Sequence, residues 1–199
     1  GYIKKTLPAG GKLVAVSIPL DSMTETQIVF GRTSLAQEMP QGSFVYFWDE
    51  TLQGWGGGIK SGKGWSVGDS NKVIKPGEGF FIKGNPAAVA DVEVTITGEV
   101  PADTTMTRAL LGGNALGTVG NPYPVDFKFG TSQLALDAPQ GSFVYFWDMA
   151  LQGWGGGIKS GKGWSVGDSN RVVQAGEGFF LRQVGAAGSW EAAKPYTWP

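Results

Sequence analysis

The residues here whose type and spacing could do chemistry are repeated carboxylates and lysines set among glycines. Three carboxylates occur twice in the chain, as Asp49, Asp69 and Glu78 and again as Asp148, Asp168 and Glu177. Glycosidases use two such groups held about 5 to 10 Å apart, a separation that sequence spacing does not establish. Two complete catalytic sites in one small chain would also be unusual. We therefore expect these carboxylates to cap turns or to pair with Lys60, Lys63 or Lys72.

A glycine-rich stretch from Gly57 to Gly64 falls one residue short of a phosphate-binding loop. That loop needs a lysine followed by Ser or Thr, whose hydroxyl binds magnesium, and then a helix whose N-terminus faces the phosphates. Here Lys63 is followed by Gly64, and residues 65–71 are turn formers without a helical stripe. We expect no helix there and predict that the protein neither binds nor hydrolyses nucleotides.

The composition narrows the chemistry further. The 199 residues include no histidine and no cysteine, so the usual general base near neutral pH, the thiolate nucleophile and the zinc–sulfur site are all missing. The run Asp69-Ser70-Asn71 is rich in oxygen atoms but lacks the spacing of a calcium loop. We expect a protein that is not an enzyme, with no cofactor and no metal site.

Charge and hydropathy argue against nucleic acid and the membrane interior as partners. With 16 basic and 17 acidic side chains the net charge is −1, whereas nucleic-acid binding needs a clustered basic face. No apolar run approaches the roughly 20 residues that cross a bilayer, so we expect neither a nucleic-acid partner nor membrane insertion. Because Gly1-Tyr2-Ile3 reads as the start of a strand, we expect a processed N-terminus.

The chain is an internal duplication. Residues 40–81 align with 139–180 at an offset of 99, and six of these 42 positions differ. The differing pairs are Glu50/Met149, Thr51/Ala150, Lys72/Arg171, Ile74/Val173, Lys75/Gln174 and Pro76/Ala175. The flanks have diverged, and 9–13 matches 111–115 only loosely. We predict two modules, 1–100 and 101–199. Recent duplication of the central block, or equivalent partners facing both copies, would each explain the uneven identity.

The patterns favour strands. Val92–Thr97 alternates apolar and polar residues, as a half-buried strand does. Ser43–Trp48 is apolar on both faces and needs cover from a second sheet and from a neighbouring module or subunit. We also expect strands at 12–18 and 79–83 and one helical turn at 33–38. The predicted fold is all-β, with two tandem modules resembling sandwiches or barrels, each of about seven or eight short strands.

Aromatic residues supply the candidate interaction surface. Trp55 and Trp65 flank several glycines, so their rings either pack over the glycines or stay exposed to bind a subunit or a sugar. The candidates are Tyr46, Trp48, Trp55 and Trp65, their copies Tyr145, Trp147, Trp154 and Trp164, and the terminal Tyr2 and Trp198. The ends 2–7 and 194–198 read as strands that pair either with a neighbour or within their own modules.

The order of motifs resembles a known group of proteins. Gly1–Gly10 (GYIKKTLPAG), Pro19-Leu20, Pro76–Ile82 (PGEGFFI) and Gly98-Glu99-Val100 follow one another as in modules of secreted tandem repeat proteins from environmental Gram-negative bacteria. The second copy departs from this pattern, since Gln174-Ala175 replaces Lys75-Pro76. The resemblance implies export and an all-β repeat fold rather than an activity.

These observations lead to one expectation and one alternative. The repeated modules, the two-faced aromatic strands and the missing catalytic chemistry favour a structural subunit of an extracellular or cell-surface assembly, such as a filament, sheath or surface layer, whose partners are copies of itself. The alternative is a pair of carbohydrate-binding or adhesion modules that stack polysaccharide on exposed tryptophans.

Overall fold

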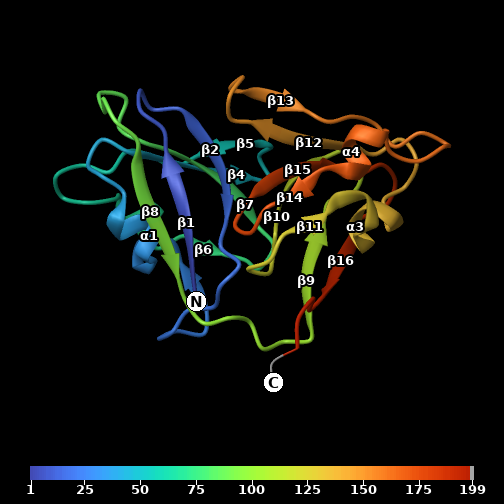
Figure 1. Ribbon diagram of the computed structural model, residues 1–199, viewed down its shortest axis with the longest axis horizontal. Coiled ribbons are helices and arrows are strands. Elements are labelled where there is room, and N and C mark those ends of the chain that lie inside the picture. The colour runs from blue at the N-terminus through green and yellow to red at the C-terminus, as the bar shows by residue number, and fades with distance from the viewer. Residues whose placement is uncertain (198–199) are drawn as a thin grey trace.

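The structure is a computed structural model that describes residues 1–197. Its elements form two similar sets in chain order, and strands far outnumber the short helices (Figure 1). The first set comprises β1 (Tyr2–Leu7), β2 (Leu13–Ser17), β3 (Ile28–Val29), η1 (Phe30–Arg32), α1 (Ser34–Glu38), β4 (Phe44–Asp49), β5 (Gly54–Gly56), α2 (Val67–Ser70), β6 (Val73–Ile74), β7 (Gly79–Lys83) and β8 (Val92–Thr97).

The second set repeats the first. It comprises β9 (Thr105–Leu110), β10 (Leu116–Gly120), β11 (Phe127–Lys128), η2 (Phe129–Thr131), α3 (Gln133–Asp137), β12 (Phe143–Asp148), β13 (Gly153–Gly155), α4 (Val166–Asn170), β14 (Val172–Val173), β15 (Gly178–Arg182) and β16 (Gly188–Ala193). The prediction of an all-β chain built from two similar modules is confirmed.

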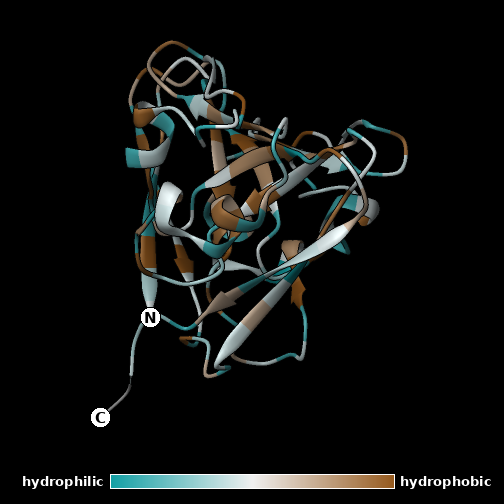
Figure 2. Ribbon diagram, turned by 90° about the vertical axis from the view of Figure 1, so that its right-hand side faces the viewer, coloured by the Kyte–Doolittle hydropathy of each residue, from teal (hydrophilic) through white to brown (hydrophobic). Residues whose placement is uncertain are grey.

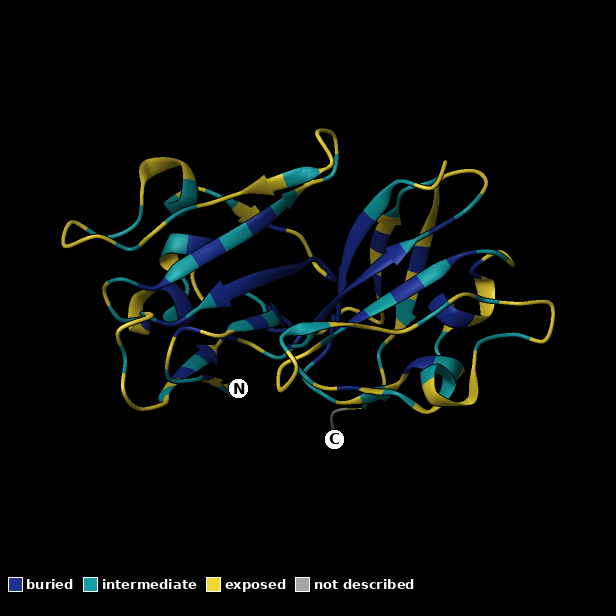
Figure 3. Cartoon of the chain, turned by 90° about the horizontal axis from the view of Figure 1, so that it is seen from above, coloured by how far each residue is buried: buried dark blue, intermediate teal, exposed yellow. Residues whose placement is uncertain are grey.

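Each module contains one four-stranded antiparallel sheet and two smaller strand pairs. The large sheets have the orders β2-β7-β4-β5 and β10-β15-β12-β13, so β5 and β13 are edge strands. The ribbon β1-β8, or β9-β16, covers the inner face of the large sheet together with α1 or α3, and short pairs β3-β6 and β11-β14 close one end. Seen from above, the modules are two lobes whose buried strands meet in the middle (Figure 3).

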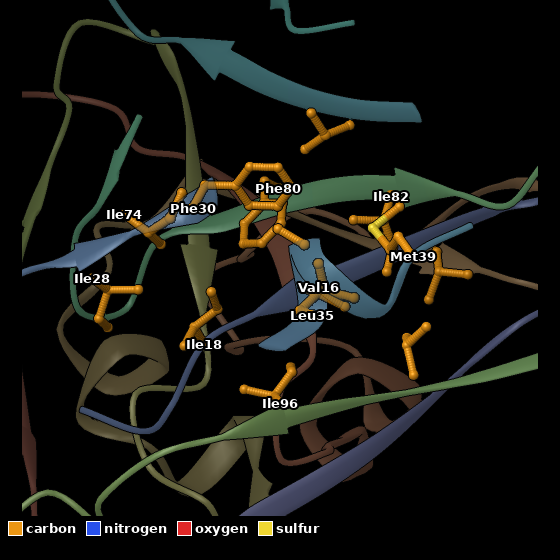
Figure 4. Close-up of a cluster of buried hydrophobic side chains, with 14 of the residues drawn as sticks. Val16, Ile18, Ile28, Phe30, Leu35, Met39, Ile74, Phe80, Ile82 and Ile96 are labelled. Carbon is orange, nitrogen blue, oxygen red and sulfur yellow. The ribbon is translucent and has the colours of Figure 1, made fainter. Parts of the chain in front are cut away.

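The core of the first module surrounds Phe30 (Figure 4). Its ring meets Phe47 at 5.2 Å and Phe80 at 5.9 Å between centroids, both edge to face, the geometry that the aromatic quadrupole favours. The second core is built in the same way around Phe129, with Trp190 where the first has Val94. Hydrophobic segments accordingly concentrate in the central strands (Figure 2).

The predicted turn at 33–38 is confirmed as α1. The Thr33 side chain accepts a hydrogen bond from Ala36 N at 3.2 Å, an N-cap. At the other end Lys60 Nζ donates to three carbonyls, those of Ala36, Gln37 and Met39, at 2.9, 2.7 and 2.6 Å. Ser132 and Lys159 repeat both caps on α3.

Two expectations from the sequence are wrong. Residues 65–71 contain α2, and the copy contains α4, because Ser66 and Ser165 cap a single turn that turn-forming residues can complete. The flanks align differently as well. Leu13 pairs with Lys83 and Leu116 pairs with Arg182, so the strand register relates β2 to β10 at an offset of 103. The offset falls from 103 to 99 after β10, because six residues connect β10 to β11 where ten connect β2 to β3, and a loop tolerates such a change in length.

Candidate functional site

The two modules meet along β2 and β7 of one and β10 and β15 of the other. Gly79 and Gly178 lie face to face, and a Cβ on either would come within 2.5 Å of a carbonyl oxygen of the opposite module. Two backbone hydrogen bonds cross reciprocally, Ser17 N to Gly176 O at 3.0 Å and Gly120 N to Gly77 O at 2.8 Å. The contacts therefore follow an approximate twofold axis, like those of a symmetric dimer.

Tryptophan and glutamine side chains repeat this reciprocity. Trp48 Nε1 donates to Leu116 O at 2.8 Å, and Trp147 Nε1 donates to Leu13 O at 3.0 Å. Gln53 bonds both backbone groups of Leu116, while its copy bonds both of Leu13. Each module thus extends the outer strand of its sister's large sheet through a side-chain amide.

Six aromatic rings form a closed cluster around the axis. Its members are Trp48, Trp55 and Phe81 with their copies Trp147, Trp154 and Phe180. Neighbouring centroids lie 5.0 to 5.5 Å apart, with interplanar angles from 73° to 89°. Edge-to-face packing on this scale holds each indole in a fixed orientation. Trp55 and Trp154 still expose 47% and 46% of their surface, so the cluster is rigid beneath and open above.

An aromatic groove opens beside this cluster. Its volume is about 520 Å³. It is lined by Trp48, Gln53, Trp55, Asn114, Leu116, Tyr145, Trp154, Phe180 and Arg182. The guanidinium carbon of Arg182 lies 4.3 Å from the centroid of Phe143, whose ring in turn stacks on Tyr145 at 6.0 Å. Both modules build the groove, so it exists only when they are joined.

Two clefts flank the junction at equivalent places, and they differ in charge. In the first, of about 390 Å³, the buried Arg108 of β9 pairs with Glu50 and donates to Thr118 O at 3.0 Å. In the second, of about 600 Å³, the corresponding residues are Lys5 and Met149. Lys5 Nζ instead donates to Ala175 O at 2.8 Å.

Burial shifts the titration of the second cleft. Desolvation lowers the pKa of Lys5, an effect that Glu177 and Asp126 partly offset. It likewise raises the pKa of Glu177, against the backbone N–H of Gln174 and the charge of Arg171. Both shifts favour the neutral forms, as expected for ionisable groups withdrawn from water.

The structure separates the predicted interaction residues into three groups. Trp48, Trp55, Trp147 and Trp154 belong to the aromatic cluster, and Tyr145 to the groove. Tyr46 lies on the outer face of β4, stacked on Phe44 at 6.1 Å, and burial raises its pKa. Trp65 and Trp164 pack against their own cores and donate to Ala36 O and Ala135 O, both at 2.9 Å, which leaves their faces little room for a partner.

The terminal candidates lie elsewhere. Tyr2 is exposed on β1, which pairs with β8 of its own module, one of the two alternatives expected for the N-terminal strand. Residues 194–197 form no strand, and Lys194 N donates to Thr104 O at 2.9 Å. Trp198 lies outside the described residues.

The repeated carboxylates cap turns, as predicted. Asp49 accepts from the backbone N–H groups of Thr51 and Leu52 at 2.9 and 2.8 Å, and Asp69 from the Ser66 hydroxyl at 2.7 Å. Glu78 accepts from Lys75 N at 2.9 Å, with Lys72 Nζ at 3.7 Å. The copies in the second module make the corresponding bonds. Of the three lysines proposed as partners, Lys60 contacts carbonyls instead.

Comparisons with known proteins give no match to a family model, to a curated protein or to a solved structure. Within residues 1–197 no helix is long and apolar enough to cross a membrane. The same described residues contain no group of three acidic side chains arranged to hold a metal ion. Function must therefore be argued from the geometry of the junction and of the free surface.

Sequence reasoning missed the polar residues of the junction. Gln53 adopts φ 50°, a conformation that few residues other than glycine take, but no motif in the sequence identifies it as a contact residue. Arg182 ends a strand and has Lys83 as its counterpart. The one signal available in the sequence was the Glu50/Met149 difference between the two copies. Glu50 pairs with Arg108, which lies in the diverged flank, so the copies differ at both partners.

Proposed function

We propose that this protein is a non-enzymatic structural subunit that associates with copies of itself in an extracellular or cell-surface assembly. The observation that carries this proposal is the duplication of exposed apolar residues. Leu52 and Leu151 are 80% and 81% exposed, and Ile59 and Ile158 are 49% and 47% exposed. Packing in a core explains why apolar residues recur inside both modules. Apolar residues that recur on the surface of both modules are costly in water unless a partner covers them.

The edge strands offer a place for such a partner. Beyond β5 the chain continues along β4 to residue 60, with Gly58 O accepting from Val45 N at 3.0 Å and Lys60 N donating to Ser43 O at 2.8 Å. Residues 54–59 carry no charge and no proline, the usual protections of a sheet edge. Lys60 would be the natural guard, but its ammonium is turned inward onto α1.

This edge is complementary to itself. Trp55 and Ile59 lie on one face of the strand, opposite Trp48 and Phe44, with only glycines between them. An antiparallel pair of two such edges centred on Gly57 places Trp55 of each chain beside Ile59 of the other. Directly opposed aromatic and β-branched side chains stabilise antiparallel pairs, and the glycines leave room for the indole.

Two equivalent edges make each chain bivalent. The second edge, residues 153–159, has the same sequence as 54–60 apart from numbering, and β13 is the outermost strand of its sheet (Figure 1). A subunit with two like contacts that do not close on each other propagates into an open chain. The net charge of −1 adds little long-range repulsion. Export follows from the resemblance to secreted repeat proteins and is part of the proposal.

Charge placed on both edges tests the proposal. The double variant Ile59→Lys with Ile158→Lys removes the cross-strand pair and adds a charge to each edge. We expect the concentration for half-maximal association, measured by light scattering and sedimentation velocity, to rise by about tenfold or more.

A matched control carries the same change elsewhere. Val67→Lys with Val166→Lys alters equally duplicated, exposed apolar residues on α2 and α4, away from the edge. This control should associate like the wild type. A wild type that stays a compact monomer at high concentration would refute self-association, and equal effects of both variants would refute the edge as its site.

The aromatic groove favours a second candidate function, the binding of carbohydrate. Trp55 and Trp154 present half-exposed indole faces held rigidly from below, and such faces stack on sugar rings with little loss of side-chain freedom. The wild type would then remain monomeric and its tryptophan fluorescence would change with added oligosaccharide.

A further inference from the structure

We propose that the aromatic groove binds a sugar ring that carries an anionic group, with Arg182 as the residue that selects the charge. The inference adds a ligand class to the second candidate function and does not depend on self-association. It rests on the polar groups that line the groove, most of which lack partners inside the protein.

Arg182 is the strongest of these groups. Its side chain forms no ion pair and no hydrogen bond with any residue from 1 to 197, and its Nε is one of two buried side-chain polar atoms there without a partner. An unpaired cation beside apolar walls is costly, and a ligand anion would offset that cost. Stacking on Phe143 at 4.3 Å holds the guanidinium plane in place, so its donors are oriented before a ligand arrives.

Other free donors surround it. The indole N–H groups of Trp55 and Trp154, the Tyr145 hydroxyl and the Asn114 side chain make no hydrogen bond within the described chain. Arginine and indole groups can only donate, and no Asp or Glu among the described residues lines the groove. A ligand that fits must supply acceptors, as a carboxylate or sulfate does.

Size and shape point to a sugar ring. The groove volume of about 520 Å³ lies within the usual range of small-ligand sites. Its walls are half-exposed indoles, and an aromatic face suits the apolar face of a pyranose while donors at the rim reach the charged substituent. A charge-assisted bond to a planar guanidinium is about twice as strong as a neutral one.

The first module provides an internal control. Lys83 occupies the position of Arg182, 5.5 Å above the ring of Phe44, and Tyr46 occupies that of Tyr145. Asn114 has Gly11 as its counterpart at the offset of 103, so that side lacks the amide. Matching substitutions in the two modules therefore separate a specific site from a general effect of charge.

Titration with defined tetrasaccharides tests the proposal, below the concentration at which light scattering detects association. The probes are tetragalacturonate, a sulfated galactose tetrasaccharide and the neutral galactose tetrasaccharide, followed by tryptophan fluorescence and calorimetry. We expect at least one anionic probe to bind about tenfold or more tightly than the neutral one. The two anionic probes distinguish a carboxylate from a sulfate.

Variants then locate the site. Arg182→Gln should weaken the anionic probe about ten- to hundredfold, while Lys83→Gln should change it less than about twofold, with circular dichroism checking the fold of each. Tyr145→Phe should weaken binding and Tyr46→Phe should not, a second comparison that stands if Arg182→Gln fails to fold. Equal binding of the neutral probe, no binding at millimolar concentration, or equal effects of matched variants would overturn the proposal.

Discussion

The two clefts beside the module junction are built from the same elements, but at one pair of equivalent positions the first contains an ion pair and the second does not. Glu50 meets the buried Arg108 in the first, whereas Met149 and Lys5 stand at these places in the second. A similar contrast lies near the axis. Ser17 donates its hydroxyl to Asn121 O and Glu177 O at 3.1 Å, while its counterpart is Gly120.

These contrasts show how a duplicated chain specifies its own pairing. Two second modules facing each other would leave Arg108 opposite Met149, without a carboxylate. Two first modules would set Ser17 against a second Ser17 in the place of Gly120. These side chains would clash, because even a Cβ at Gly120 would lie 2.3 Å from Ser17 Cβ. Both wrong pairings are penalised, which is how specificity usually arises. The junction is thus specific for a first module against a second one, and two like modules do not fit it.

Breaking the ion pair should produce the largest effect. Glu50→Met, which copies the second module, leaves Arg108 buried and without a carboxylate, so we expect a loss of about 3 to 5 kcal/mol in the free energy of unfolding. Met149→Glu adds a carboxylate near Lys5 and should change stability by less than about 1 kcal/mol. Guanidinium denaturation measures both, and equal losses would contradict the asymmetry.

Exchanging the residues at the axis should have the next largest effect. Gly120→Ser overpacks the junction and should cost about 1 to 3 kcal/mol. Ser17→Gly removes the hydroxyl that crosses to the second module and should cost about 1 kcal/mol. The double variant reverses the two sides, so we expect it to be more stable than the sum of the single losses predicts. Strict additivity in the denaturation cycle would show that the two residues do not compete for one space.

Local pattern allowed most of the fold to be predicted. The alternation of apolar and polar residues in Val92–Thr97 predicted a strand buried on one face, and the apolar run Phe44–Trp48 predicted a strand covered on both faces. Both strands are present. The short helix α2 was missed because one turn capped by Ser66 needs no apolar stripe. The expectation that a neighbouring module covers the second face of β4 is met by Trp48, whose N–H reaches Leu116 of the sister module.

The site was only half predictable, for a physical reason. Trp55 and Trp154 stood out as large rings among glycines, but whether a ring packs inward or outward depends on the sister sheet. Trp65 also follows a glycine in the sequence, yet it packs against Phe30. Arg182 and Asn114 reach the groove only through the register of β10 and β15, which the offset of 103 in the flank hides.

Substituting the lysines that cap α1 and α3 should cost the same stability in both modules, whereas substitutions in the two clefts should not. Lys60→Met and Lys159→Met each remove three bonds to carbonyls at the end of a short helix. We expect a loss of about 1 to 2 kcal/mol for each, because those carbonyls and the helix dipole lose their cation. Thermal unfolding of the two variants should give equal shifts, and a clear difference would mean that the modules do not share this part of their structure.

The smallest effect concerns the pH dependence of the second cleft. Burial raises the pKa of Glu177 above its unfolded value of 4.5, so the folded state holds this proton more tightly than the unfolded chain does. That contribution to stability is complete below pH 4.5 and is lost as the pH rises through the folded pKa. Burial lowers the pKa of Lys5, so its contribution has the opposite sign and is lost as the pH falls through its folded pKa.

Glu177→Gln isolates this carboxyl group from the other acids. The variant keeps an oxygen that can accept from Gln174 N, which Glu177 Oε2 does at 2.8 Å, but it cannot ionise. Denaturation midpoints of both proteins, measured in steps upward from pH 4.5, should fall for the wild type relative to the variant until the folded pKa is passed, and then run parallel. Parallel curves from the start would mean that Glu177 titrates alike in the folded and unfolded chain, and that this cleft is open to water.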